Sequence, residues 1–258
     1  MLANDETALH SFCARILGWA TDREVAVEQA IRSIELAADH GAALVLLGET
    51  DLVPIAHALH RRTLGPEQPF IVCDRNRRNT DASVRCPSNQ ESGVAAVAAA
   101  TGGSVCVRFS RLPRDFSSMV ALLRNPDASV QLIVCADARF DTHPFLALPA
   151  PILVPSLITR RDELPRIIDE YAFDALAELR APDTCFTDDD HAWILEHCPL
   201  TLAEIEKATL RKVALRGSRN RTNAAERLGM APVSLTRWLG RRKAPNVTDG
   251  GARPDAGR

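Results

Sequence analysis

Between residues 31 and 170, hydrophobic residues gather in short runs that are separated by segments long enough to form helices. Apolar runs that alternate with helix-length segments predict a parallel α/β sheet whose two faces are both covered. The predicted strands are ALVLL (43–47), PFIVC (69–73), SVCVRF (104–109), VQLIVCA (130–136) and ILV (152–154).

After residue 200 the apolar positions recur at helical spacing. Thr201 can cap a first helix, and Glu204, three residues later, completes a capping box. This helix is expected to end near Gly217. Its apolar stripe consists of Leu202, Ile205, Leu210, Val213 and Ala214.

Two shorter helices are predicted next. Asn220 or Thr222 can cap the first of them, which runs through Leu228, and Gly229 supplies the turn after it. Pro232 suits the first turn of the last helix. The apolar residues of that helix are Leu235, Trp238 and Leu239.

The two short helices meet the requirements of a helix-turn-helix. This motif needs a small residue where its helices touch, a turn residue that tolerates positive φ, and apolar anchors on the second helix. Ala225, Gly229, Leu235 and Trp238 occupy these places. The opposite face is polar and basic, which fits a reader of the DNA major groove; the alternative is a piece of core with accidental basicity. This face and the residues after it comprise Ser234, Thr236, Arg237, Arg241, Arg242 and Lys243.

The distribution of charge supports a nucleic-acid partner, although the formal net charge of the whole chain is only −2. Residues 1–200 contain 18 arginines and no lysine against 28 acids, a balance of −10, whereas residues 201–258 carry a balance of +8. A basic segment on an acidic body is the pattern expected of a nucleic-acid-binding appendage rather than of a solvated tail.

The overall composition excludes two other classes of protein. A hydrophobic fraction of 46% excludes disorder throughout. No apolar run approaches the roughly 20 residues that span a bilayer, and the N-terminal residues lack a signal sequence. Seven cysteines in a chain without an export signal predict a reducing compartment. Cys73, Cys106 and Cys135 each lie inside an apolar run and are expected to be buried, reduced thiols.

The segment TLAEIEKATLRKVALRGSRNRTNAAERLGMAPVSLTRWLGRRK resembles the Fis-type helix-turn-helix that ends many bacterial enhancer-binding activators. The matching words are LAEIE, NRT, AAERLGM and SLTRWL. The resemblance implies a homodimer with the long first helix in its interface, and DNA phosphate contacts at Asn220, Arg221 and Thr222. Pro232 and Trp238 depart from the family pattern, so base preference does not carry over.

The body resembles, in fragments over roughly residues 30–200, the AAA+ domain of sigma-54-dependent activators. The stretch IELAADHGAALVLLGETDLVPIAHALHRRT is similar to its helix, strand, phosphate loop and helix. AATGGSVCVRFSRLP resembles its Gly-Gly strand with the Walker B acids, and LITRRDELPRIIDEYA its arginine-rich segment and following helix. The alternative is an unrelated α/β domain.

The residues that the family uses to bind and hydrolyse ATP are missing. A phosphate loop needs glycines and a lysine, yet Gly48-Glu49-Thr50 is followed by Asp51-Leu52-Val53-Pro54, and no lysine precedes Lys207. Arg108 and Ser110 stand where the family has its Asp-Glu pair. Residues 74–102 contain nothing like the GAFTGA loop, and Ala203 replaces a nucleotide-sensing arginine. We therefore expect no ATP hydrolysis and no sigma-factor remodelling.

Other chemistry receives little support. The motifs of serine hydrolases and zinc proteases are absent, so no catalytic residue, cofactor or metal ligand is predicted. A zinc site is the minor interpretation of CFTDDDHAWILEHC, because the spacing of Cys185, His191, His197 and Cys198 is unsuitable. Asp188–Asp190 should open a helix, and His57 and His60 should face solvent or the sheet edge.

The predicted fold class is α/β, a degenerate AAA+-like parallel-sheet domain followed by a small all-α Fis-type module. The predicted divisions are a helical lead-in (1–30), the α/β domain (31–170), a lid-like helical linker (171–200), the DNA-binding module (201–243) and a disordered tail (244–258).

The predicted function is that of a cytoplasmic, nucleoid-associated bacterial transcriptional regulator that binds double-stranded DNA as a homodimer. Its body would serve in oligomerisation or in binding a signal or a protein partner, with no membrane contact. The alternative is an interaction module that docks on another regulator, with DNA binding secondary. Pro232, Ser234, Thr236 and Arg237 should face the groove, with Arg241, Arg242 and Lys243 following the phosphates.

Overall fold

The structure, a computed structural model, describes residues 2–77, 87–125, 128–137, 149–198 and 200–241. Arg242, Lys243 and the tail 244–258, for which predictions were made, lie outside the described residues. In the described part of the chain, no helix has the length and apolarity needed to cross a membrane.

The centre of the body is a six-stranded sheet, and all of its strand pairs are parallel. The strand order is β3-β2-β4-β5-β1-β6. Five strands coincide with the five predicted runs to within one residue at either end, whereas β3 was not predicted. The strands are β1 (Leu44–Leu47), β2 (Phe70–Cys73), β3 (Ser88–Gln90), β4 (Ser104–Arg108), β5 (Gln131–Ala136) and β6 (Ile152–Leu153).

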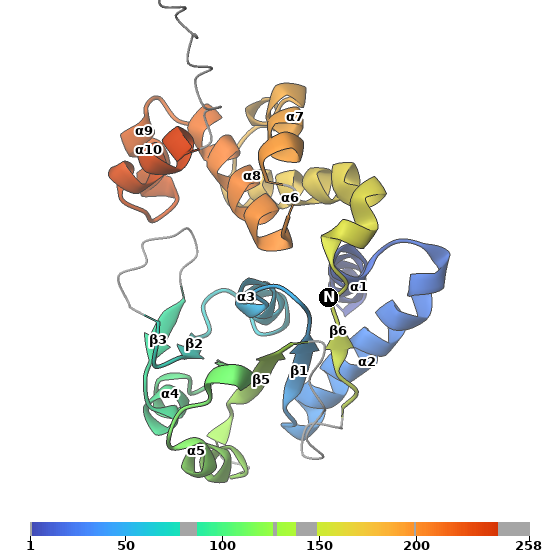
Figure 1. Ribbon diagram of the computed structural model, residues 1–258, viewed down its shortest axis with the longest axis vertical. Coiled ribbons are helices and arrows are strands. Elements are labelled where there is room, and N and C mark those ends of the chain that lie inside the picture. The colour runs from blue at the N-terminus through green and yellow to red at the C-terminus, as the bar shows by residue number, and fades with distance from the viewer. Residues whose placement is uncertain (1, 78–86, 126–127, 138–148, 199, 242–258) are drawn as a thin grey trace, which may run out of the picture.

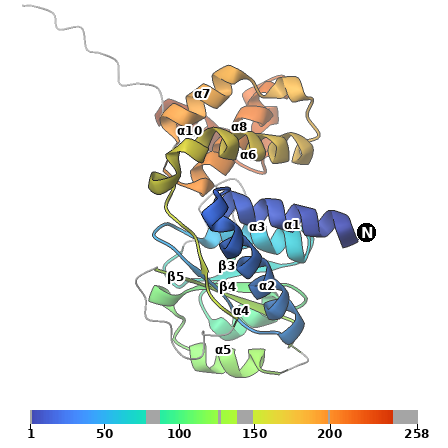
Figure 2. The ribbon, with the colours of Figure 1, turned by 90° about the vertical axis from the view of Figure 1, so that its right-hand side faces the viewer.

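Helices cover both faces of the sheet, as predicted. Successive side chains of a strand point to opposite faces, so neighbouring residues of one strand pack against different helices. Leu44 and Leu46 of β1 belong to the core on the side of α1 (Leu2–Leu17), α2 (Glu24–His40) and α3 (Val53–Thr63). Val45, between them, belongs to the core formed with α4 (Gly93–Ala99) and α5 (Phe116–Leu123). Figure 2 shows these two helical layers on either side of the strands.

The C-terminal helices gather beyond α1 and α3, on the side of the sheet away from α4 and α5 (Figures 1 and 2). Their side chains continue the hydrophobic core of the body without a break. The helices are α6 (Leu164–Glu178), α7 (Asp188–His197), α8 (Leu202–Arg216), α9 (Arg221–Arg227) and α10 (Pro232–Arg241). Short 3-10 turns are η1 (Thr21–Arg23), η2 (Phe109–Arg111), η5 (Leu157–Glu163) and η6 (Asp183–Cys185).

Charged side chains join the helical module to the body. The Asp174 carboxylate on α6 accepts hydrogen bonds from Arg15 of α1 at 2.8 Å and from Arg62 of α3 at 2.6 Å. Arg160, which is 3% exposed, donates to the carbonyl oxygens of Arg15 and Ile16 at the end of α1. A buried guanidinium on these last carbonyls satisfies acceptors that a helix end otherwise leaves open.

Two predicted division points lie inside helices. Residue 30 is in the middle of α2, and residue 170 is in the middle of α6. Both helices pack their apolar stripes into the shared core. The lead-in and the linker are therefore continuous with the α/β body in this structure.

His60 is only 1% exposed, so the prediction that it faces solvent or the sheet edge was wrong. Its Nε2 lies 3.0 Å from the Gln68 carbonyl oxygen and its Nδ1 lies 2.8 Å from Ser104 Oγ. Because the carbonyl can only accept, Nε2 carries the proton and Nδ1 accepts from the serine hydroxyl. The ring thereby ties α3 to the start of β4.

We expect His60 to make stability depend on pH. Burial lowers the pKa of His60 below its ordinary value of 6.5. The unfolded chain therefore binds a proton first as the pH falls, and stability declines below about pH 6.5. In urea unfolding at pH 7.0 and 5.5, His60→Gln should show a smaller loss than the wild type. His10→Gln, at an exposed position, should leave the wild-type loss unchanged; equal losses in His60→Gln and wild type would contradict the assignment.

Asp115 holds α4 and α5 together. Its carboxylate accepts from the backbone N–H groups of Gly93 (2.8 Å) and Val94 (3.0 Å) and from the Ser92 hydroxyl (2.7 Å). These bonds, that from Val94 first, lower the pKa of Asp115 to about 2. We expect Asp115→Ala to reduce the free energy of unfolding by about 1 kcal/mol, the usual effect of losing a helix cap. Thermal unfolding at pH 7 measures this, and a wild-type midpoint would refute it.

Candidate functional site

The C-terminal helices begin where the sequence predicted. The Thr201 hydroxyl accepts from the Glu204 backbone N–H at 3.1 Å and caps α8. Of the two candidate caps for the next helix, Asn220 is the one used: its Oδ1 accepts from the Asn223 backbone N–H at 2.9 Å. The start of α9 is thus fixed by a side chain that also lies at the surface.

The turn between α9 and α10 has the expected conformation. Gly229 has φ of 62°, a region that favours glycine. The Met230 N–H donates to the Ala225 carbonyl at 2.9 Å, which closes the end of α9. Ala225 and Leu235 are fully buried and Trp238 is 8% exposed. The small contact residue and both anchors therefore occupy the places predicted for them.

Of the predicted DNA-contact residues whose exposure the structure describes, most lie at the surface of α9 and α10. Arg221 and Thr222 are exposed at the start of α9, next to Asn220. On α10, Pro232, Thr236 and Arg237 are exposed and Ser234 is half-buried. Arg241 is the last residue of α10. Arg237 thus projects from the helix that buries Leu235 and Trp238 on its other side.

α10 is anchored to the rest of the helical module through aromatic side chains. The rings of Trp238 and Trp193 of α7 lie 5.3 Å apart between centroids. Arg211 and Lys212 of α8 lie over these two rings, at 4.8 Å and 4.0 Å respectively. Arg227 of α9 donates to the Gly217 carbonyl at 2.7 Å and to the carbonyl of Leu179, the residue after α6. The orientation of α10 is therefore coupled to the body.

Helix α8 is largely buried within its own chain. Its apolar stripe packs against α6 and α7, and Arg216 is the one residue of α8 that counts as exposed. The buried Asp190 of α7 pairs with Lys212 at 3.3 Å and with the Arg216 guanidinium. The hydrogen bond to Asp190 raises the pKa of Arg216. Two of the cations counted in the basic segment therefore serve the internal packing.

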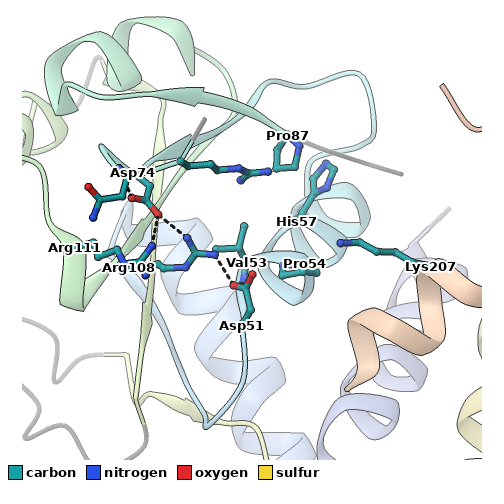
Figure 3. A pocket seen from close by; sticks show the side chains of 11 residues that line it. Asp51, Val53, Pro54, His57, Asp74, Pro87, Arg108, Arg111 and Lys207 are labelled. Carbon is teal, nitrogen blue, oxygen red and sulfur yellow. Dashed lines mark hydrogen bonds and ion pairs between the residues drawn. The ribbon is translucent and has the colours of Figure 1, made fainter. Parts of the chain in front are cut away.

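The carboxyl ends of β1, β2 and β4 carry a chain of ion pairs (Figure 3). The Arg108 guanidinium lies 2.8 Å from an Asp51 oxygen and 2.6 Å from an Asp74 oxygen. Arg111 lies 3.5 Å from the same oxygen of Asp74, whose side chain is fully buried. Burial alone would lower the pKa of Arg108, but its two carboxylate partners outweigh burial and raise it.

The loop between β1 and α3 places a carboxylate at the N-terminus of α3. Asp51 Oδ1 accepts from the Val53 backbone N–H at 3.2 Å, at the start of α3, and also pairs with Arg108. A helix N-terminus attracts anions through its open N–H groups, and here the chain supplies its own anion. A hollow of about 220 Å³ beside the loop is lined by Gly48–Leu52, Arg108 and Ser110, among other residues.

Sequence reasoning identified Asp51, Arg108 and Ser110 in this region but missed Asp74. The available signal was the position of Asp74, directly after the buried strand PFIVC. Acids at the carboxyl ends of neighbouring parallel strands meet at one edge of the sheet. The pairing of Asp74 with Arg108 depends on the order of the strands, and β2 and β4 are neighbours here.

The histidines of the segment 185–198, considered above as zinc ligands, contact backbone carbonyl groups instead. His191 Nε2 lies 3.2 Å from the Pro165 carbonyl, and His197 Nδ1 lies 2.9 Å from the Trp193 carbonyl. Cys185 and Cys198 are buried, as are the strand cysteines Cys73, Cys106 and Cys135. Among the residues that the structure describes, no cluster of His, Cys, Asp and Glu could hold a metal ion.

The fold and site define an α/β protein with a parallel sheet and a C-terminal helical module. No model of a known protein family matches the chain, and no curated protein is significantly similar to it. Similar solved structures include three crystal structures of NtrX from Brucella abortus, one in complex with ATP and one with ADP. They are 14–15% identical, cover 93% of this chain and 72–73% of their own, and have TM-scores of 0.42–0.43.

Proposed function

We propose that this protein is a DNA-binding transcriptional regulator without enzymatic activity. α9 and α10 would form a Fis-type helix-turn-helix, and α10 would enter the major groove of double-stranded DNA. The observation that carries this proposal is that α10 has one buried and one exposed face. Leu235 and Trp238 are buried, while Thr236 and Arg237 are exposed. A helix anchored by one face and polar on the other is how such motifs present side chains to base edges.

The start of α9 supports the same proposal. Asn220, Arg221 and Thr222 surround the N-terminus of this helix at the surface. A helix N-terminus and an arginine together suit a backbone phosphate, and such contacts position a protein on the duplex without reading its sequence. Base recognition would then fall to Pro232, Ser234, Thr236 and Arg237 on α10.

Binding as a homodimer is part of the proposal, but the packing of α8 constrains its form. Because the apolar stripe of α8 is covered by α6 and α7, a second copy could meet α8 only through its less buried residues. Dimerisation through the fully buried stripe would require α8 to leave α6. Light scattering of the full chain with and without DNA measures which assembly forms.

The body is proposed to be inactive as an ATPase and to connect α10 to a signal or partner. Asp51 occupies the N-terminal N–H group of α3 and pairs with Arg108, so added phosphate would face a carboxylate. We expect no nucleotide binding at millimolar ATP with magnesium in isothermal titration. Measurable binding would refute an inactive body while leaving DNA binding untouched.

DNA binding is tested with the full chain and a fluorescent duplex from the region upstream of its own gene. We expect specific binding that survives excess non-specific competitor and weakens steeply as salt increases, because contacts with phosphates release counterions. Affinity that does not change between 50 and 200 mM salt, or a complete absence of binding to this and to randomised duplexes, would overturn the proposal.

A further inference from the structure

A polar cleft of about 310 Å³ opens at the carboxyl edge of the sheet, between the body and α8 (Figure 3). Its walls come from the ends of β1, β2 and β4, from α3, and from α8. Parallel α/β sheets bind ligands at this edge, where neighbouring strands continue in opposite directions along the sheet. Here β2 leads to the outer strand β3, whereas its neighbour β4 leads the other way, to β5.

The charges around the cleft favour an anion. Among the described residues that line it, the cations are Arg77, Arg108, Arg111 and Lys207, and the carboxylates are Asp51 and Asp74. Both carboxylates are already held by Arg108. Arg111 reaches Asp74 only at 3.5 Å and is half exposed, so most of its hydrogen-bonding capacity is available.

Lys207 adds a cation from the C-terminal helices to the lining of this cleft. It lies on α8, and its side chain extends toward His57 of α3 at the mouth of the cleft (Figure 3). Within the described part of the chain, Lys207 has no ion-pair partner. An ammonium group and an imidazole on facing helices, with an arginine on the floor, can each donate to one bound oxyanion.

We propose that this cleft binds a small organic dianion, a phosphate ester or a dicarboxylate, between Lys207, His57 and Arg111. Lys207 and Arg111 bring two positive charges to the two negative charges of the ligand. The volume is at the lower end of the roughly 300–1,000 Å³ of ligand pockets, which suits a small metabolite better than a dinucleotide. The start of α3 forms one wall of the cleft, and there Asp51 already accepts from the Val53 N–H group, so the ligand would bind on the side of Lys207, His57 and Arg111.

A ligand at this site would connect the sheet to the helix that precedes α9 and α10. Lys207 is on α8, α8 packs on α6, and Arg227 fastens α9 to the end of α6. An anion that bridges Lys207 and Arg111 therefore stabilises one placement of α10 relative to the body. This regulatory consequence rests on the proposed function, whereas binding of the dianion does not.

The experiment is isothermal titration and thermal unfolding of the full chain with four probes: inorganic phosphate, glycerol 3-phosphate, succinate and ATP with magnesium. Sodium chloride at equal ionic strength is the control for general salt effects. We expect at least one of the three small dianions to bind and to raise the unfolding temperature, since a ligand of the folded state stabilises it. The preferred dianion identifies the ligand as a phosphate ester or a dicarboxylate.

Variants separate the site from non-specific attraction. Lys207→Gln and Arg111→Gln should each weaken binding at least tenfold, Lys207→Arg should retain most of it, and Arg32→Gln on the exposed surface of α2 should match the wild type. No binding of any small dianion, or wild-type affinity in Lys207→Gln, overturns the site. If a dianion binds but does not change the affinity for DNA, the regulatory link is refuted. If the protein never binds DNA, only the proposed function is refuted, and the anion site stands.

Discussion

Replacing Arg108 with glutamine is expected to lower the free energy of unfolding by about 3 kcal/mol, because it leaves the Asp74 carboxylate buried without its main partner. The Asp74 side chain has no exposed surface, and Arg108 approaches it at 2.6 Å. Arg111, at 3.5 Å, and the Asn76 backbone N–H, at 2.9 Å, remain as weaker compensation. For this reason we place the effect at the lower end of the usual range for a broken buried pair.

Urea unfolding at pH 7 measures the loss, and a second substitution tests its cause. If the loss comes from an unpaired carboxylate, Asp74→Asn in the Arg108→Gln background should recover about 1 kcal/mol or more, since the buried charge is then absent. Arg111→Gln is the matched control, because Arg111 is half exposed and should contribute less than about 1 kcal/mol. A double variant no more stable than Arg108→Gln would show that Arg108 acts in another way.

The pattern of hydrophobic residues predicted most of the sheet. The runs at β1, β2, β4, β5 and β6 are apolar because both faces of those strands are covered, and this produces a signal that sequence alone carries. β3 has the sequence Ser-Asn-Gln and lies at the edge of the sheet. The sequence of β3 gives no hydrophobic signal, because its buried residue, Asn89, is held by hydrogen bonds. The Asn89 side chain accepts from the Asp74 N–H and donates to the Asp74 carbonyl.

The candidate sites were predicted less completely, because their geometry depends on contacts between distant residues. Arg108 and Asp51 are far apart in the sequence and meet only because of the strand order. His60 was misplaced since its helical position could not reveal that Ser104 and the Gln68 carbonyl would satisfy its ring in the core. The local features of the C-terminal helices were predicted well, because a cap at Asn220 and positive φ at Gly229 depend on neighbouring residues.

The segment at α8 shows why one sequence supported two interpretations. LAEIE resembles the first helix of a Fis-type module, and CPLTLAEIE also overlays a stretch of the AAA+ family's helical region. In the structure α8 packs on α6 and α7 and is followed directly by α9 and α10. α8 thus completes the core of the body and also precedes the proposed DNA-binding helices. A ligand that shifts α8 at the cleft would therefore also shift α9 and α10.

Arg237→Ala is expected to weaken specific DNA binding about 10- to 100-fold, while non-specific binding changes only a few-fold. Arg237 is exposed on α10, opposite the buried Leu235 and Trp238, where it can approach base edges. A bidentate arginine–guanine contact contributes about 1–3 kcal/mol to discrimination between bases. Fluorescence anisotropy with specific and scrambled duplexes at two salt concentrations measures both affinities.

A conservative substitution at Arg237 and a control substitution on α2 distinguish a base contact from a phosphate contact. Lysine keeps the charge but not the planar fork, so Arg237→Lys should restore non-specific affinity and recover little of the specificity if the partner is a base. If Arg237 instead contacts a phosphate, Arg237→Lys recovers nearly everything and Arg237→Ala reduces the salt slope by about one. Arg32→Ala on α2 should behave as wild type in all assays. Equal losses from Arg32→Ala and Arg237→Ala would mean that bulk charge, rather than the face of α10, governs binding.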